Sequence, residues 1–136
     1  MPQYDVIVVG LGAIGGAALR VLAKRGVRAL GIERFAPGHD QGSSHGETRM
    51  IRLGYFEHPS YVPLLRKTYA LWLAIESEAN AKLLHVTGIA EMGTPDSDVV
   101  AGTLAASRLH DLPHEVLSAK DAMRRFPAFR LPEDFV

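Results

Sequence analysis

The chain has 136 residues and no cysteine, and its 15 Lys and Arg residues balance 15 Asp and Glu residues. A net charge of zero favours neither nucleic acid nor an anionic membrane as a partner, and the lack of cysteine excludes disulfides and thiolate metal sites. An apolar share of 47% can support a core, and no stretch has the pattern of a secretory signal or a bilayer span. The chain is therefore expected to be cytoplasmic.

The chain begins with a predicted strand, a glycine-rich turn and a predicted helix. Val6–Val9 is an unbroken apolar run, as in a parallel strand that is covered on both faces. Gly10, Gly12 and Gly15 then form the pattern Gly-x-Gly-x-x-Gly. In a dinucleotide site the first glycine permits the tight turn, the second admits the pyrophosphate, and the third lets the helix approach the strand. The positive end of the helix dipole would face the anion.

The residues after this fingerprint fit a β-α-β unit. Apolar side chains recur at helical spacing through Ala13–Arg25, Gly26 is placed to end that helix, and Val27–Ile32 follows as a second strand. Glu33 ends the strand 18 residues after the third glycine, near the distance at which a carboxylate meets the ribose hydroxyls. The pattern predicts a dinucleotide-binding half-site. The alternative is a glycine-rich helix start that binds nothing.

The next stretch is rich in loop-forming residues and contains two arginines. Arg34–Gly46 has several glycines and no periodicity, which predicts a loop, and such a long loop behind a nucleotide site is usually functional. Glu47–Leu53 could form a short helix in which Arg49 and Arg52, three residues apart, share one face. Such a pair could bind a carboxylate or offset negative charge on a reduced cofactor. The alternative is a pair of solvated arginines.

The second half of the chain is predicted to be mainly helical. The expected elements are a helix over Tyr61–Asn80, a hairpin of strands Leu83–Val86 and Ile89–Met92 around Thr87-Gly88, a helix over Asp98–Leu109, a strand over Glu115–Leu117, and a helix capped at Ser118.

Two motifs suggest chemistry that their surroundings do not support. Gly42–Gly46 fits the nucleophile elbow Gly-x-Ser-x-Gly around Ser44, but that elbow needs a strand immediately before it, and none is predicted. His110 and His114 are four residues apart, but Pro113 lies between them and no acidic third ligand is arranged nearby. We therefore expect neither a nucleophilic serine nor a metal site.

The segment Gly42–Arg52, followed by Tyr55 and the run Tyr61-Val-Pro-Leu64, closely resembles the N-terminal region of the monomeric sarcosine oxidase and N-methyl-tryptophan oxidase family. The Gly-Ser-x-His-Gly-x-Thr-Arg stretch carries most of the specificity, since the glycine fingerprint occurs in many families. The resemblance is strong over Tyr4–Leu73. It continues more faintly through Arg125-Phe126-Pro127 to the end of the chain.

The resemblance implies an α/β fold that is incomplete here. Residues 1–80 would be the N-terminal part of a Rossmann-like FAD-binding domain that begins with the β-α-β unit, and residues 81–136 would begin a substrate-binding domain. The remainder of an enzyme chain would be needed to complete the fold, and this segment alone would be inactive. The implied cofactor is FAD. The implied reaction is oxidation of the C–N bond of an N-methyl amino acid, followed by imine hydrolysis and reoxidation of the cofactor by oxygen to give hydrogen peroxide.

The resemblance also implies roles for individual residues. The adenosine diphosphate end of FAD would be held by Gly10, Gly12, Gly15 and Glu33, with Arg34, Ser43 and Ser44 lining the adjacent loop. His45 and Arg49 would lie near the flavin ring, Arg52 would bind the substrate carboxylate, and Tyr55 to Tyr61 would form a mobile loop over the substrate.

Two departures and two alternatives accompany the resemblance. Ser44 stands where members often have a second histidine, and Phe56 replaces a usual glycine. An NAD-dependent dehydrogenase would share the glycines and Glu33, but it would give the segment from His45 to Arg52 no role. A non-catalytic nucleotide-binding module is the other alternative. Colour and peroxide production distinguish these from an oxidase.

Overall fold

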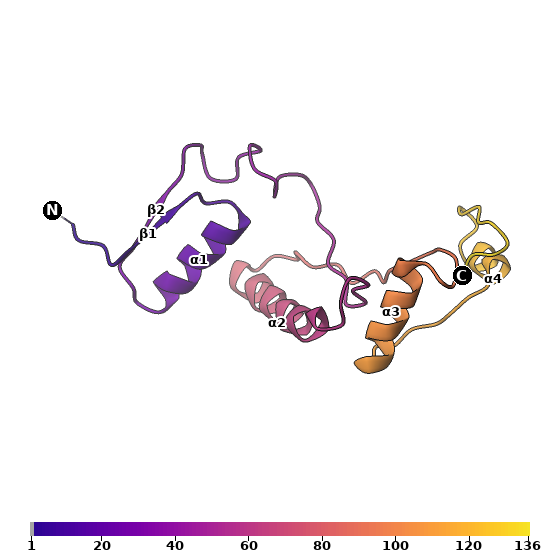
Figure 1. Cartoon of the computed structure of the whole chain (residues 1–136). Coiled ribbons are helices and arrows are strands. Elements are labelled where there is room, and N and C mark those ends of the chain that lie inside the picture. The colour runs from indigo at the N-terminus through magenta and orange to yellow at the C-terminus, as the bar shows by residue number, and fades with distance from the viewer. Residues whose placement is uncertain (1) are drawn as a thin grey trace. The chain divides into compact units, whose positions relative to one another are not determined.

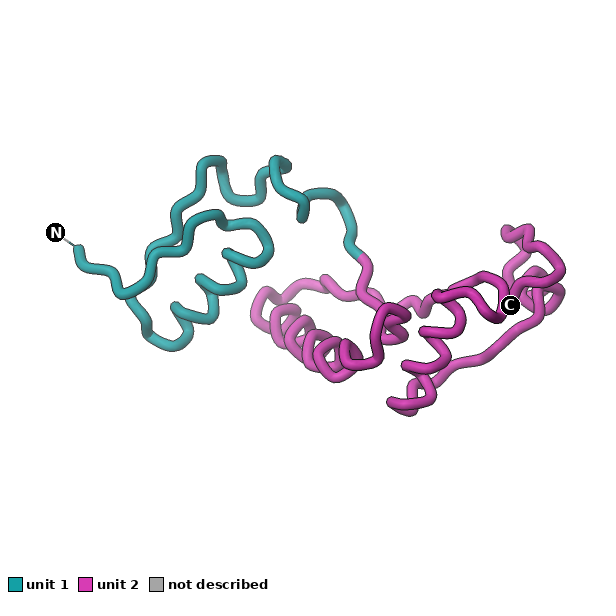
Figure 2. Tube along the Cα trace, viewed as in Figure 1, with its two compact units in different colours: residues 1–49 teal, residues 50–136 magenta. Residues whose placement is uncertain are grey.

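The computed structural model describes residues 2–136, which divide into two compact units, residues 2–49 and residues 50–136 (Figure 2). We call them the N-terminal unit and the C-terminal unit. The first holds the β-α-β elements and the second holds three helices (Figure 1).

The N-terminal unit is the predicted β-α-β unit. Strand β1 (Val6–Val9) pairs in parallel with β2 (Ala29–Ile32), with Val6 opposite Ala29, and helix α1 (Ala13–Lys24) connects the two strands. Gly31 allows α1 to approach the sheet, because a Cβ atom there would lie 2.6 Å from the side chain of Leu19.

The start of β2 is later than predicted, because the helix end uses the residues before it. Gly26 adopts a φ of +73° and donates its N–H to the carbonyl of Ala23, and Val27 donates to the carbonyl of Leu22. These two bonds make the Schellman arrangement that caps helices at a glycine. Val27 therefore completes the helix end, and the prediction of a strand over 27–32 is two residues too long.

Residues 33–60 form no helix or strand, so the loop over 34–46 is confirmed and the short helix over 47–53 is wrong. A seven-residue helix has little cooperativity to offset the cost of its first turn. Side-chain contacts compete with it here, since the Arg49 guanidinium donates to the carbonyls of Thr48 and Ser43. These hydrogen bonds therefore favour an irregular backbone conformation over a helix in this segment.

The C-terminal unit is built on helices α2 (Tyr61–Ala79) and α3 (Asp98–Leu109), both close to their predicted bounds. Its core cluster joins Val62 of α2, Ala106 of α3 and Leu112, with Leu53 packed against it. Asn80 ends α2 in the left-handed conformation at a φ of +48°.

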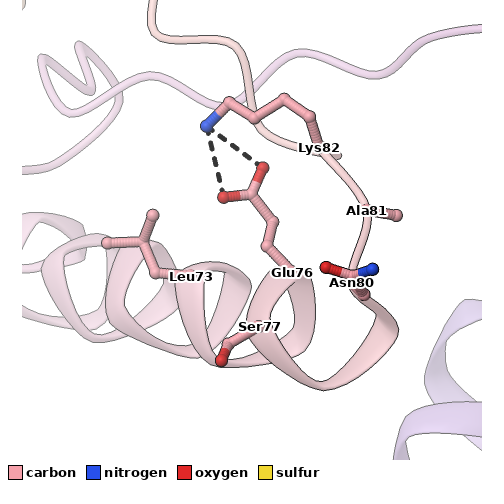
Figure 3. A pocket seen from close by; sticks show the side chains of 6 residues that line it. All are labelled: Leu73, Glu76, Ser77, Asn80, Ala81 and Lys82. Carbon is pink, nitrogen blue, oxygen red and sulfur yellow. Dashed lines mark hydrogen bonds and ion pairs between the residues drawn. The ribbon is translucent and has the colours of Figure 1, made fainter.

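The predicted hairpin over residues 83–92 is absent from the structure, in which all these residues are described. The N–H groups of Leu83 and Leu84 each donate to Glu76 Oε1 at 2.7 Å, and Lys82 Nζ lies 3.2 Å from both carboxylate oxygens (Figure 3). These bonds fix residues 82–84, which follow α2, against the end of that helix. The backbone bonds from Leu84 and Leu83 are the main reason that the pKa of Glu76 is lowered. A lone hairpin is marginal in water, so this carboxylate anchor prevails over strand pairing.

Figure 3 shows the side chains that line an open pocket at this anchor, namely Leu73, Glu76, Ser77, Asn80, Ala81 and Lys82. Its charged groups are already paired with each other, and its carboxylate is bonded to backbone N–H groups. The pocket is thus part of the helix end.

Helix α4 (Ala119–Arg125) begins at the predicted cap, where Ser118 Oγ accepts the N–H of Asp121 at 3.2 Å. The strand predicted over 115–117 is wrong, because this segment has no ladder partner and the Glu115 carboxylate instead pairs with Arg125. No helix of the described chain is both long and apolar enough to cross a membrane.

Candidate nucleotide and substrate-carboxylate sites

The turn between β1 and α1 has the geometry that its glycines predict. Gly10 adopts a φ of +87° and donates its N–H to the carbonyl of Ile32 at 2.8 Å, which joins the turn to β2. A Cβ atom on Gly15 would lie 1.8 Å from the Gly10 carbonyl oxygen, so only glycine permits this close packing. Gly12 is different, because an added Cβ would meet nothing within 4 Å.

The N-terminus of α1 is open to a ligand. Gly12 is its N-cap residue, no side chain caps it, and its first turn contains no acidic residue. Backbone N–H groups at such an end, together with the helix dipole, favour an anion. The residues present therefore fit a pyrophosphate, which would occupy the space that a side chain at Gly12 would fill.

Glu33 lies beside this turn and is held by backbone groups. Its Oε2 accepts the N–H of Leu11 at 2.7 Å, and its Oε1 accepts those of Arg34 at 2.6 Å and Phe35 at 3.2 Å. His39 Nε2 lies 3.4 Å from Oε2. The bond from Leu11, followed by that from Phe35, lowers the Glu33 pKa to about 2. Glu33 is therefore a fixed, ionised acceptor next to the open helix end.

The loop after Glu33 gathers the next predicted site residues. His45 Nδ1 lies 2.6 Å from the Gly42 carbonyl oxygen, which can only accept, so the proton is on Nδ1. The Arg49 guanidinium donates to the Thr48 carbonyl at 2.6 Å and to the Ser43 carbonyl at 3.1 Å. Gly46 makes room for it, since a Cβ there would lie 2.7 Å from Arg49 Nη1. The loop thus carries an arginine whose hydrogen bonds go to neutral carbonyls.

Two further loop residues, Arg34 and Ser44, are exposed. Arg34 stacks on Phe35, with its guanidinium carbon 5.4 Å from the ring centroid. The residues before Ser44 form no strand, so the geometry of a nucleophile elbow is absent from the described loop.

Arg49 and Arg52 do not share a helix face, because residues 47–53 form no helix, and the two arginines fall in different units. That part of the prediction is wrong. The side chain of Arg52 is 18% exposed, and its Nη2 donates to both Glu57 oxygens at 3.0 Å. Its guanidinium carbon lies 4.5 Å from the Tyr55 ring centroid and 5.2 Å from that of Phe56.

A second carboxylate lies at the other side of this guanidinium. Glu91 Oε1 is 3.5 Å from Arg52 Nε, and the Glu91 side chain is 13% exposed. The geometry falls short of a hydrogen bond, since Arg52 Nε is buried without a hydrogen-bond partner in the described structure. Glu91 Oε2 accepts the hydroxyl of Thr103 on α3. Arg52 is therefore held by two carboxylates and two aromatic rings of its own unit.

Three residues that surround the predicted groups, namely His39, Glu57 and Glu91, were given no site role from the sequence. Glu57 has a local signal, because an acidic residue five positions after Arg52 can fold back within one loop. Glu91 has none, since only the packing of the C-terminal unit brings it to Arg52.

The two other histidines that the sequence singled out do not form a metal site. His114 Nδ1 bonds the Leu112 carbonyl at 2.8 Å, and His110 ends α3. Within residues 2–136, no group of three or more His, Asp or Glu side chains could hold a metal ion.

Comparison with known proteins identifies similar sequences over almost the whole chain. Residues 5–136 match the model of the DAO family, described as FAD dependent oxidoreductase. The chain is 47% identical to monomeric sarcosine oxidase from Streptomyces avermitilis over 99% of the chain and 35% of that protein. It is 33% identical to N-methyl-L-tryptophan oxidase from Yersinia pestis over 98% of the chain and 36% of that protein.

A solved structure is similar throughout the chain. The open form of NikD, an unusual amino acid oxidase essential for nikkomycin biosynthesis, matches with a TM-score of 0.85 and 34% identity over 99% of the chain and 35% of NikD. The chain thus spans about a third of the length of these relatives. These findings confirm the resemblance and the predicted fold class.

Proposed function

The chain belongs to the DAO family of FAD-dependent oxidoreductases, and from that premise we propose that it is the N-terminal part of an oxidase for the C–N bond of a secondary-amine amino acid. The observation that carries this proposal is the 47% identity to a monomeric sarcosine oxidase across 99% of the chain. The family uses FAD, so the NAD-dependent alternative is not supported. In the proposal, an N-methyl amino acid is the substrate, oxygen is the final acceptor and hydrogen peroxide is a product.

In this proposal, residues 1–80 belong to the FAD-binding domain and residues 81–136 begin the substrate domain. The rest of an enzyme of the relatives' length would cover the apolar side chains that are exposed in the N-terminal unit, such as Val9 and Ile14, which are 80% and 89% exposed. A cytoplasmic location is part of the proposal, and cell fractionation would test it.

The N-terminal unit would hold the adenosine diphosphate end of FAD. The open end of α1 at Gly12 would bind the pyrophosphate through backbone N–H groups. Glu33 would accept the ribose hydroxyls in place of its two longer contacts, from Phe35 N–H at 3.2 Å and His39 at 3.4 Å. Its shorter bond to Leu11 N–H would keep the carboxylate fixed in place.

The loop after Glu33 would contribute charge and polar groups. Bound FAD supplies the two-electron acceptor for the reaction. Arg49 would place a positive charge beside it, because its hydrogen bonds go to carbonyls and leave that charge uncompensated within the described chain. His45 would present Nε2 as an acceptor, since its Nδ1 proton bonds Gly42. Ser43 and Ser44 would line the same loop.

Arg52 would bind the substrate carboxylate. An arginine suits this task because its planar donors match a carboxylate. Its Nη2 is engaged by Glu57, so an incoming carboxylate would take the place of Glu57. The rings of Tyr55 and Phe56 would keep the guanidinium in position during that exchange.

The test uses a full-length chimaera, in which residues 1–136 replace the matching segment of the Streptomyces avermitilis relative. The chimaera should bind FAD, turn yellow and release peroxide when sarcosine is added. Arg52→Ala should keep the flavin. It should lower kcat/KM for sarcosine by an amount equivalent to about 2–5 kcal/mol, because a desolvated carboxylate loses its charged partner. Sarcosine methyl ester, which lacks that charge, should be affected much less.

Arg124→Ala is the matched control, because Arg124 is exposed and pairs with Asp121 of the same short helix. It should leave both substrates unchanged. Equal losses for acid and ester in Arg52→Ala would refute the carboxylate role. A colourless chimaera that releases no peroxide would favour a non-catalytic nucleotide-binding module instead.

A further inference from the structure

Glu91 lies behind Arg52 and connects it to α3. One carboxylate oxygen is 3.5 Å from Arg52 Nε, and the other accepts the Thr103 hydroxyl. The Arg52 and Glu91 side chains are only 18% and 13% exposed. A nearly buried carboxylate that is fixed by a helix residue is a rigid partner for a guanidinium.

The backbone around Arg52 is also fitted to α3. A Cβ atom on Gly102 would lie 2.2 Å from the Phe56 carbonyl oxygen, and one on Gly54 would lie 3.0 Å from Thr103 Cγ2. The loop and the helix can approach this closely because both positions are glycine and have no side chain. The loop that carries Arg52 therefore lies directly against the helix residue that holds Glu91.

The two carboxylates at Arg52 are not equivalent. Glu57 is the more exposed of the two, at 42%, and its only hydrogen bonds are those from Arg52 in the described structure. Glu91 has a second anchor in Thr103, and it lies beside a buried Nε that has no hydrogen-bond partner. A buried donor without a partner is costly, so Nε needs an acceptor, and Glu91 Oε1 lies 3.5 Å from it.

We propose that Glu91, braced by Thr103, is a positioning residue that holds Arg52 from its Nε side while a substrate carboxylate replaces Glu57. This rests on the proposed function of Arg52. Glu91 contacts Arg52 and Thr103 and does not touch the substrate. It restricts the rotation of the guanidinium, so that less freedom is lost when a carboxylate binds.

A positioning role for Glu91 and simple charge repulsion between Glu91 and a bound carboxylate predict opposite changes in carboxylate affinity when Glu91 is removed. Removing a negative charge beside Arg52 would by itself strengthen carboxylate binding, whereas losing the positioning contact weakens it. In the full-length chimaera, Glu91→Ala should raise the Kd of acetate, used as a probe carboxylate, and the KM of sarcosine about tenfold, equivalent to about 1.4 kcal/mol. The kcat for sarcosine and the KM of its methyl ester should change less than twofold.

Three variants separate positioning from a general loss of structure. Glu91→Gln keeps an acceptor for Nε, so its Kd for acetate should stay within threefold of the parent. Thr103→Val removes the brace at nearly constant volume and should raise the Kd about threefold. Thr103→Ser restores the hydroxyl and should restore the parent value. The Val and Ser pair still tests the proposal if Glu91→Ala does not fold.

Hydrogen exchange gives a readout that does not depend on substrate. In Glu91→Ala, peptides that cover residues 50–57 should exchange faster while α2 peptides stay unchanged. An unchanged or lowered Kd for acetate in Glu91→Ala, equal effects on acid and ester, or a loss in Glu91→Gln as large as in Glu91→Ala would overturn the proposal. If Arg52→Ala fails to alter acid and ester discrimination, the function proposed for Arg52 is wrong, and the exchange measurement still decides whether Glu91 positions it.

Discussion

The two units are stabilised in different ways. In the N-terminal unit, α1 has no buried residue, and the connections among its elements are mainly backbone hydrogen bonds, glycine contacts and the Glu33 carboxylate. The C-terminal unit has a core cluster, in which Val62 and Ala106 are fully buried. The first unit is thus organised by the path of its backbone, and the second by side-chain packing.

This difference extends to the two candidate sites. Glu33 is fixed by its two shorter bonds, from the N–H groups of Leu11 and Arg34, which cannot move unless the backbone moves. Arg52 is fixed by side chains, of which Glu57 is partly exposed and, in the proposed function, gives way to the substrate carboxylate. A preformed backbone site suits a cofactor that stays bound, whereas exchangeable side-chain contacts suit a substrate that enters and leaves. Substitutions should therefore act differently in the two units.

The largest effect is expected from Gly15→Ala. The new methyl group would lie 1.8 Å from the Gly10 carbonyl, so α1 must move away from the turn, at a cost of about 3 kcal/mol or more. Gly12→Val is the matched variant, because a Cβ at Gly12 meets nothing in the chain. Gly15→Ala should therefore speed hydrogen exchange throughout residues 5–33 of the chimaera. Gly12→Val should leave exchange of the unliganded protein unchanged but remove the yellow colour. Stoichiometric FAD in Gly12→Val would refute the pyrophosphate assignment.

The next effect concerns the packed unit. Val62→Ala would leave a cavity at a side chain that is fully buried, and should lower local stability by about 2 kcal/mol. Leu64→Ala is the control on the same helix, since Leu64 is 60% exposed. Hydrogen exchange should rise in α2 and α3 for Val62→Ala but not for Leu64→Ala. If Val62→Ala raised hydrogen exchange equally in residues 5–33, the two units would not be stabilised independently of each other.

The elements that could be predicted from the sequence are those with a complete local signal. The β-α-β unit has an apolar run, a glycine fingerprint and a Gly26 helix end, and the bounds of α3 match the prediction. The failures lie where side-chain hydrogen bonds to nearby backbone groups compete with a regular element. The Glu76 carboxylate accepts backbone N–H groups of the chain after α2, where a hairpin was predicted. The Arg49 guanidinium donates to a loop carbonyl, where a helix was predicted.

The candidate sites follow the same division. The proximity of Glu33 to the glycine turn could be predicted, because both lie at the carboxyl ends of neighbouring parallel strands. The surroundings of Arg52 could not be predicted, because Glu91 is 39 residues away along the chain and reaches it only through the packing of α3.

A pH-dependent effect should distinguish the N-terminal unit. The folded pKa of Glu33 is lowered from 4.5 to about 2, so its ionised form stabilises the unit fully above pH 4.5. That stabilisation is lost progressively as the pH falls from 4.5 to about 2. Pepsin cleavage of residues 5–33 in the chimaera, divided at each pH by the cleavage rate of an unfolded reference peptide to remove the pH dependence of pepsin itself, should therefore accelerate over this range. Glu33→Gln should be cleaved readily even at pH 5 and should lack the acceleration.

Asp5 is the control for this pH effect, because its pKa is also lowered, chiefly by the side-chain hydrogen bond from Arg28. That pair is exposed at the edge of the unit, with side chains 50% and 61% exposed, so Asp5→Asn should retain the acceleration. If Asp5→Asn abolishes the acceleration and Glu33→Gln does not, Glu33 is not the group that links the unit to pH.

The smallest effect is expected at the cap of α4. Ser118 Oγ accepts the Asp121 N–H at 3.2 Å and donates to Asp121 Oδ2 at 2.7 Å. Ser118→Ala should therefore lower local helix stability by about 1 kcal/mol, the usual cost of a lost serine cap, whereas Ser118→Thr keeps the hydroxyl as both donor and acceptor and should recover most of it. The measurement is hydrogen exchange of peptides over residues 119–126 in the chimaera. Because both bonds of this cap lie within the C-terminal unit, residues 5–33 should not respond. Faster exchange in residues 5–33 would contradict the separate stabilisation of the two units. Equal exchange in Ser118→Ala and the parent would contradict the role of Ser118 as a cap.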